Sequence, residues 1–210
     1  MNAGGAVPRR GLVVLLVGPD GSGKSTLASR VIERARPRFS ETLHLHWRPG
    51  LLPRAGSLVG IESGDPTEPH AVDPHGPLLS FALLVYHWID FFLGSWFKVR
   101  PVAARGGLVV MERGWPDLGV DPRRYHLRIS PRLVELLGRL LPAPDVVVVL
   151  EGDPHELHRR KSELPVTELA RQIARWREVR FSARTARVRL DALQEPERLI
   201  DVVLQHIDAS

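Results

Sequence analysis

The sequence of 210 residues contains no cysteine. This absence excludes disulfide bonds, thiolate metal sites and a cysteine nucleophile, and it leaves the redox environment undecided. Lysine is also scarce, because only three of the 29 basic residues are lysines and 26 are arginines. A GC-rich genome gives this bias, although arginine is also the better bidentate ligand for phosphate. The net charge of +5 fits anionic substrates or nucleic acid and does not choose between them.

Targeting signals are also missing from the sequence. Residues 1–10 lead directly into an apolar strand pattern, without the apolar region and cleavage site of a signal peptide, so we expect a cytoplasmic protein. One segment, Leu78–Val99, is apolar over about a transmembrane length, but His87, Asp90 and Gly94 interrupt it. Because a charge in mid-membrane is costly, we expect a buried core helix and no membrane span.

Short runs rich in valine and leucine alternate with helical patterns, and there are no internal repeats. Strands are predicted at 11–17, 42–47, 108–111, 145–150 and 188–190, and helices at 24–36, 78–99, 130–141, 153–161, from 165 and at 196–206. The alternation predicts an α/β fold, a doubly wound five-stranded parallel sheet with helices on both faces. Residues 1–210 should form a single domain. Ligands should then bind at the carboxyl ends of the strands.

A phosphate-binding loop follows the first predicted strand. Residues 18–25 match the pattern G-x-x-x-x-G-K-[ST], in which glycines let backbone N–H groups turn toward an anion. The lysine should reach the β- and γ-phosphates, and the serine should bind Mg²⁺. The predicted nucleotide-binding residues are Gly18, Asp20, Gly21, Ser22, Gly23, Lys24, Ser25 and Thr26, with ATP as phosphoryl donor and Mg²⁺ as cofactor. The motif therefore predicts a P-loop NTPase fold.

An acidic residue and an arginine end the third predicted strand. In this fold Glu112 should face the phosphates, where a carboxylate can hold Mg²⁺ directly or through water. Arg113 can neutralise charge on the transferred phosphoryl group, which makes it a candidate catalytic residue. The alternative is a surface ion pair that contributes little.

Arginines cluster after the fourth predicted strand. Arg159 and Arg160 end one predicted helix, and Arg171, Arg175 and further arginines follow in the next. Most of them could be a solvated face, since cations also suit a helix C-terminus. A mobile basic segment can instead close over a triphosphate and exclude water. We predict that Arg159 binds the nucleotide and that Arg160 is catalytic, within a lid-like segment of about 154–180.

Together these motifs resemble thymidylate kinase and its relatives, from Gly11 to about Arg180. The resemblance implies that Asp20 contacts a sugar hydroxyl of the acceptor and that Arg48, in a loop similar to the family's Arg-Glu-Pro-Gly motif, contacts the acceptor phosphate. It also implies a P-loop fold of the nucleoside monophosphate kinase type and a homodimer. Glu112 stands where the family has Asp, and the stretch 115–125 departs from the family pattern and looks like a divergent branch.

An insert of about 48–105 should cover the acceptor side of the sheet. It contains an irregular Pro- and Gly-rich loop over 48–77 and an aromatic helix, in which Asp90 is a candidate ligand for an acceptor hydroxyl. The aromatic side chains could stack on the acceptor or simply pack in the core.

The leading functional hypothesis is transfer of the γ-phosphoryl group of ATP to a small acceptor, a nucleoside monophosphate or a related phosphorylated metabolite. No general base is needed for an anionic acceptor. A kinase of a sugar or secondary-metabolite hydroxyl is the first alternative and would need Asp20 or Glu112 as base. A regulatory nucleotide switch is the second. A nucleic-acid partner is the weakest reading, because the arginines are spread over several helices.

Overall fold

Five strands form one parallel sheet in the computed structural model, which describes residues 10–53, 70 and 72–210. They are β1 (Leu12–Val17), β2 (Thr42–Leu45), β3 (Leu108–Glu112), β4 (Val146–Glu151) and β5 (Ala186–Asp191). The order across the sheet is β2-β3-β1-β4-β5, with every pair parallel. The predicted doubly wound sheet is therefore confirmed, and the carboxyl ends of all five strands lie along one edge.

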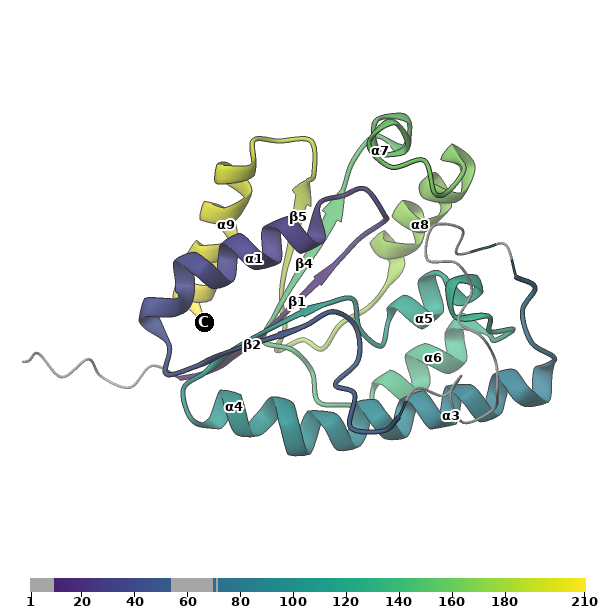
Figure 1. Cartoon of the computed structure of the whole chain (residues 1–210), viewed down its shortest axis with the longest axis horizontal. Coiled ribbons are helices and arrows are strands. Elements are labelled where there is room, and N and C mark those ends of the chain that lie inside the picture. Colours follow the sequence, from purple (N-terminus) through teal and green to yellow (C-terminus); the bar gives the residue numbers. More distant parts are fainter. Residues whose placement is uncertain (1–9, 54–69, 71) are drawn as a thin grey trace, which may run out of the picture.

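Helices connect the strands and cover both faces of the sheet (Figure 1). They are α1 (Lys24–Ala35), α3 (Pro77–Gly94), α4 (Arg100–Ala104), α5 (Asp117–Val120), α6 (Pro131–Gly138), α7 (Pro154–Arg160), α8 (Val166–Glu178) and α9 (Pro196–Ala209). Two 3₁₀ turns, η1 (Arg36–Arg38) and η3 (Pro122–Tyr125), and a π-helical turn, η2 (Ser95–Val99), complete the described elements.

The sheet separates two hydrophobic cores because alternate side chains of a strand point to opposite faces. Leu12, Val14 and Leu16 of β1 pack in the core that α1 and α9 cover. Leu15 and Val17 belong to the second core, beneath α3, α5 and α6. Both faces of β1 are buried, which explains why its sequence is apolar throughout instead of alternating.

The apolar segment forms one long helical stretch, α3–η2–α4, that continues past Pro101 to Ala104. The predicted end near Pro101 was therefore wrong. A π-helical turn precedes this proline, which stands in the first turn of α4. In the π-helical turn the N–H of Arg100 donates to the carbonyl oxygen of Ser95, and this change of hydrogen-bond spacing lets the helix continue past a residue that has no N–H.

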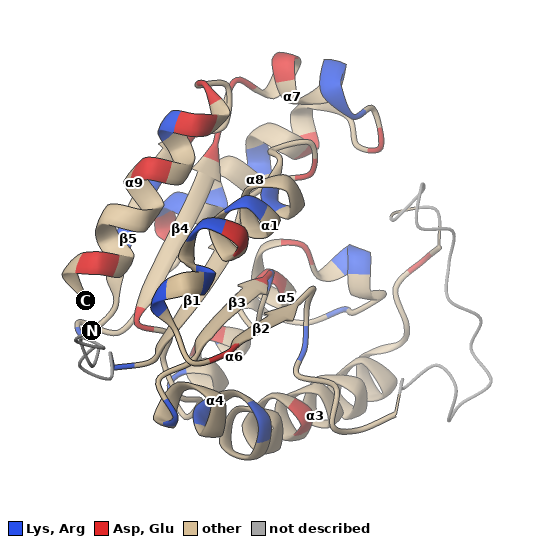
Figure 2. Cartoon of the chain, turned by 60° about the vertical axis from the view of Figure 1, so that its left-hand side comes forward, with Lys and Arg blue, Asp and Glu red and all other residues tan. Residues whose placement is uncertain are grey.

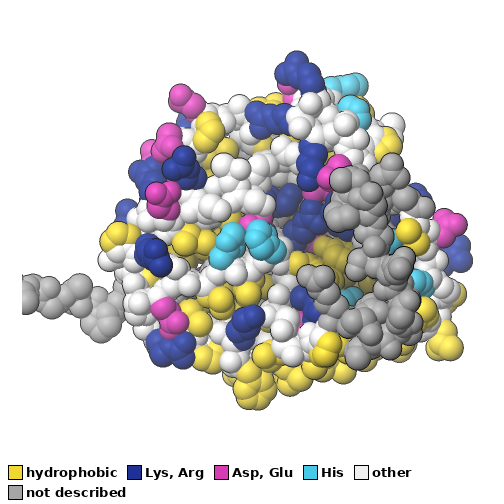
Figure 3. Space-filling model, viewed as in Figure 1, with side chains coloured by type: hydrophobic (Ala, Val, Ile, Leu, Met, Phe, Trp, Pro, Cys, Tyr) yellow, Lys and Arg dark blue, Asp and Glu magenta, His cyan; other side chains and the backbone are white. Residues whose placement is uncertain are grey.

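Only one face of this stretch is buried. Leu78, Phe81 and Phe97 expose 85%, 51% and 71% of their surface, and Figure 3 shows hydrophobic side chains along the lower edge, over α3 and α4. Figure 2 shows how few charged residues α3 carries. The prediction of a buried core helix is thus correct for one face only. Within the described part of the chain, Pro77–Ala104 is also the one helix long and apolar enough to cross a membrane.

The segment between β3 and α6 was predicted to be a loop, but it contains α5 and η3. Proline begins the 3₁₀ turn, and the side chain of Asp121 accepts a hydrogen bond from the backbone N–H of Arg124. Such side-chain caps stabilise short turns that carry little hydrophobic periodicity. These turns hold Arg124 and Tyr125 above the carboxyl end of the sheet.

Candidate active site

The P-loop forms an anion nest at the carboxyl end of β1. Gly18, Gly21 and Gly23 have φ angles of 145°, 78° and 79°, which side-chain-bearing residues rarely adopt. A Cβ atom on Gly18 would lie 2.4 Å from a carbonyl oxygen of β4. Ser22 Oγ donates a hydrogen bond of 2.8 Å to the carbonyl oxygen of Pro19. These constraints leave the N-terminus of α1 facing the pocket, where its partial positive charge favours a phosphate.

Lys24 is buried within this loop. Its Nζ donates to the carbonyl oxygens of Gly18 and Pro19, at 2.9 and 2.7 Å. Burial, reinforced by the nearby guanidinium of Arg113, lowers the pKa of Lys24 to about 7. A phosphate bound in the nest would supply the negative charge that restores the ammonium form. Without a bound phosphate, the Lys24 side chain is therefore only partly protonated near neutral pH.

Glu112 ends β3 and is only 3% exposed. Ser25 Oγ donates a hydrogen bond to its Oε2. The imidazoles of His44 and His46 approach its Oε1, at 2.6 and 3.3 Å. A hydroxyl and a carboxylate placed side by side are ligands that Mg²⁺ accepts, so Ser25 and Glu112 fit the predicted cofactor.

Asp20 lies between two guanidinium groups. Arg113 and Arg124 each donate a hydrogen bond to one of its carboxylate oxygens. Arg113 has a φ of 65°, and the turn is held because Asp117 accepts a hydrogen bond of 2.7 Å from the N–H of Gly114. Burial raises the pKa of Asp117 to about 6. Two cations from the segment after β3 thus converge on Asp20 of the P-loop.

Arg48 and Asp90 form a buried ion pair of 2.9 Å, with side-chain exposures of 11% and 0%. Asp90 also accepts hydrogen bonds from two backbone N–H groups of the loop that contains Arg48. The loop packs on α3 at Gly94, where a Cβ atom would lie 2.1 Å from Pro49 Cβ. Asp90, predicted to bind the acceptor, braces this loop, and neither it nor Arg48 lines the pocket described below.

An aromatic cluster follows the end of β2. The rings of Trp47 and Tyr125 stack with centroids 4.7 Å apart, and His87 meets Trp47 edge-on at 5.0 Å. Among the described residues, Trp47 Nε1 and His87 Nδ1 are buried without a hydrogen-bond partner. Burial lowers the pKa of His87 to about 4, with a contribution from Arg48, so this imidazole is neutral near pH 7. Buried polar atoms of this kind are costly unless water or a ligand satisfies them.

The two arginines at the end of α7 have different surroundings. Arg160 lines the pocket, and its guanidinium donates to the carbonyl oxygen of Ala192 at 2.9 Å. Arg159, predicted to bind the nucleotide, is not among the residues that line the pocket and pairs with Glu156 in the same helix. An exposed pair of this kind matches the solvated face that the sequence left open.

The P-loop and the side chains beside it surround a cavity of about 550 Å³ at the carboxyl edge of the sheet. Its lining comprises Asp20, Gly21, Gly23, Lys24, Ser25, Thr26, His46, Trp47, Glu112, Arg113, Arg124, Tyr125, Arg160 and Lys161. A larger cavity of about 1790 Å³ contains none of the P-loop residues and lies near the opposite ends of β1 and β4. The chemistry-bearing residues therefore lie in the smaller cavity.

The sequence did not identify five residues of this lining as site residues: His46, Trp47, Arg124, Tyr125 and Lys161. Trp47 directly follows β2, so its place at the carboxyl edge was a usable signal. Arg124 had no such signal, because its approach to Asp20 spans 104 residues of chain. The fold of the segment between β3 and α6 decides that approach.

Comparisons with known proteins agree with this fold. No protein-family model matches the sequence. The chain is 26% identical over 192 residues to a probable thymidylate kinase from Pyrobaculum aerophilum, with 89% of this chain and 91% of that protein covered. A crystal structure of thymidylate kinase from Ehrlichia chaffeensis shares the fold with a TM-score of 0.61 at 15% identity, over 94% of this chain and 98% of that one. The relative therefore supports a thymidylate kinase-like family of P-loop nucleotide kinases for this chain, and the solved structure supports the fold.

Proposed function

We propose that the protein transfers the γ-phosphoryl group of Mg·ATP to a nucleoside monophosphate. The observation that carries this proposal is the joint lining of one cavity by the P-loop and by Arg113, Arg124, Trp47 and Tyr125. The P-loop suits a triphosphate, the guanidinium pair suits a second anion, and the stacked rings suit a base. The names of the relative and of the structural neighbour point to the same activity.

On the donor side, the chain's own residues neutralise and position charge. Lys24 is the cation at the β- and γ-phosphates, and Arg160 lies at the entrance from α7. Ser25 and Glu112 would hold Mg²⁺, which supplies charge neutralisation on the phosphates when bound. Phosphoryl transfer needs little covalent chemistry from the protein, so this arrangement supplies most of what the reaction requires.

On the acceptor side, Arg113 and Arg124 would bind the acceptor phosphate while Asp20 keeps both groups in place. Trp47 lines the cavity, and its Nε1, which has no hydrogen-bond partner among the described residues, would donate to the acceptor. The segment of about 48–105 then acts as the acceptor-side insert and that of about 154–180 as the lid of a single domain. Residues 54–69 and 71 of this insert lie outside the described residues.

Asp20 is a poor general base, since taking up a proton would weaken two ion pairs at once. Glu112 is likewise engaged by Ser25 and His44. An acceptor that is already anionic needs no base, whereas a neutral hydroxyl does. This contrast favours a phosphorylated acceptor over a sugar or secondary-metabolite hydroxyl.

The test is ADP release from Mg·ATP in the presence of dTMP, other nucleoside monophosphates, sugar phosphates and free sugars. We expect stimulation by a nucleoside monophosphate. Trp47→Leu should raise the KM for that acceptor roughly tenfold by removing a stacking surface, whereas Trp96→Leu, on the exposed side of the helical stretch, should not. Stimulation by free sugars alone would replace this proposal with a hydroxyl kinase, and ATP binding without any stimulation would replace it with a nucleotide switch.

A further inference from the structure

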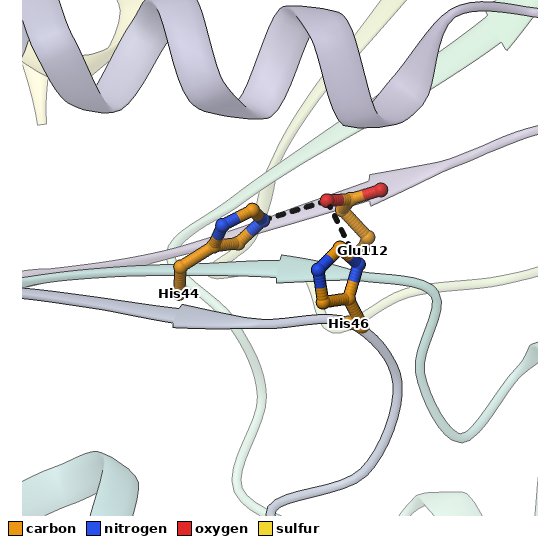
Figure 4. Close-up of side chains that lie close together, drawn as sticks. All are labelled: His44, His46 and Glu112. Carbon is orange, nitrogen blue, oxygen red and sulfur yellow. Dashed lines mark hydrogen bonds and ion pairs between the residues drawn. The ribbon is translucent and has the colours of Figure 1, made fainter.

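Two histidines and a glutamate converge beside the P-loop (Figure 4). His44 belongs to β2, His46 follows its end, and Glu112 is the last residue of the neighbouring β3. Residues two apart on an extended chain point to the same side, so both imidazoles face the carboxylate. The potential ligand atoms of the three side chains all lie within 4.8 Å of one another.

The two oxygens of Glu112 have different neighbours. Oε2 accepts the hydroxyl hydrogen of Ser25 on the P-loop, whereas both imidazoles approach Oε1. Ligands at about 2.0–2.2 Å from a metal lie roughly 3 Å or more from one another. The His46–Glu112 separation of 3.3 Å already meets this spacing, and that of His44 at 2.6 Å needs only a small outward movement.

The chemistry of this set differs from that of a magnesium site. Mg²⁺ prefers oxygen ligands and keeps much of its water. Imidazole nitrogens favour zinc and its first-row neighbours, and two imidazoles with one carboxylate leave coordination positions open for water or substrate. His46 is 77% exposed at its side chain while Glu112 is 4% exposed, so an ion could enter from solvent and rest on a buried anion.

We propose that His44, His46 and Glu112 bind a divalent transition-metal ion of the Zn²⁺ type, at the edge of the nucleotide cavity. This site is distinct in ligand chemistry from the Mg²⁺ position beside Ser25, although both use Glu112. The proposal does not depend on the identity of the acceptor. It explains why two histidines gather on one carboxylate at a strand end, where holding Glu112 in place would need only one.

The test uses the metal-free full chain without nucleotide, titrated with Zn²⁺ by calorimetry and with Co²⁺ by visible absorption. We expect binding with ligand-field bands typical of nitrogen and oxygen ligation. His44→Ala and His46→Ala should each weaken Zn²⁺ binding by about 100-fold or more, beyond the effect of losing an outer-shell group. His155→Ala, at an exposed position of α7, is the matched control and should bind as the unaltered chain does. The absence of cysteine removes thiolates as competing ligands.

A second group, His70, Asp121 and Glu168, also brings ligand atoms together. Zn²⁺ binding that survives His46→Ala but disappears in His70→Ala would overturn the proposal and assign the ion to that group. Zn²⁺ binding equal in His46→Ala and His155→Ala, or none in the unaltered chain, would leave the histidines as hydrogen-bond partners of Glu112 and also overturn it. Thermal unfolding of each variant shows whether it is folded, and Zn²⁺ should raise the Tm only where it binds.

Discussion

The donor and acceptor sides of the cavity are built in different ways. The donor side comes largely from one stretch of eight residues, 18–25, whose glycines and buried lysine form the phosphate nest. The acceptor side draws Asp20, Trp47, Arg113, Arg124 and Tyr125 from four separate segments. A nest of backbone N–H groups binds any phosphate, whereas side chains brought together by the fold determine which second molecule fits. Specificity in this chain should therefore reside on the acceptor side.

Removing the ammonium group of Lys24 should impair the donor side of the cavity, and we expect this effect to be the largest. Lys24→Met should lower kcat/KM for ADP release by about 10²–10³-fold, because it deletes a preorganised charge at the transferred group. Arg30→Met, on an exposed face of the same helix and paired only with Glu33 among the contacts described, is the control. A loss of less than tenfold in Lys24→Met would show that this cation does not act on the phosphates.

Breaking the Arg48–Asp90 ion pair, which braces the loop, should have the next largest effect. It should lower the stability of the fold. Asp90→Asn leaves Arg48 buried without its counterion, so we expect the free energy of unfolding in urea to fall by about 3 kcal/mol. Asp201→Asn removes an exposed partner of Arg34 and should change it by less than about 1 kcal/mol. Equal losses in the two variants would show that the buried pair does not brace the loop.

The acceptor side should lose selectivity without losing the nucleotide. Arg124→Ala should raise the KM for the nucleoside monophosphate by about 10- to 100-fold, the usual range for a charge-assisted hydrogen bond to phosphate, while the Kd for ATP stays within about threefold. The neighbouring Arg123→Ala is exposed and serves as the control. An equal weakening of ATP and acceptor would place Arg124 on both sides and remove the distinction.

The smallest expected effect is a change in the number of protons that the protein takes up when ATP binds. Near pH 8 most Lys24 side chains are neutral, because the pKa is about 7, and a bound phosphate raises it again. ATP binding at pH 8 should therefore take up to about one proton from the buffer, and fewer at pH 6, where Lys24 is already charged. Calorimetry in two buffers of different ionisation enthalpy measures this uptake. Uptake that persists in Lys24→Met would assign the proton to another group.

The sheet could be predicted from the sequence because strands buried on both faces leave continuous apolar runs, as in β1 and β4. The ends of the helices were harder to predict from the sequence. Pro101 indicated a stop, yet the preceding π-helical turn let the helix continue. The turns at α5 and η3 escaped prediction because elements of four residues carry no measurable period.

The same contrast holds for the site residues. Glu112 and Arg113 were identifiable because the end of a buried strand faces the ligand in this fold. For Arg159 and Asp90, the sequence could not show which partner each charge has in the folded chain. Arg159 pairs with Glu156 one helical turn away, whereas Asp90 pairs with Arg48, which is distant in the sequence. Which partner a charge selects depends on distances that only the folded chain defines.

The sequence by itself determined the parallel sheet, the phosphate nest and the resemblance to thymidylate kinases. These follow from contiguous residues, because burial patterns and glycine dihedral angles act over a few positions. Only the tertiary structure decided that Arg124 reaches Asp20, that Trp47 stacks on Tyr125 and that His44 and His46 share Glu112. Each of those contacts joins segments that are far apart in the chain, and their meeting depends on the packing of whole elements.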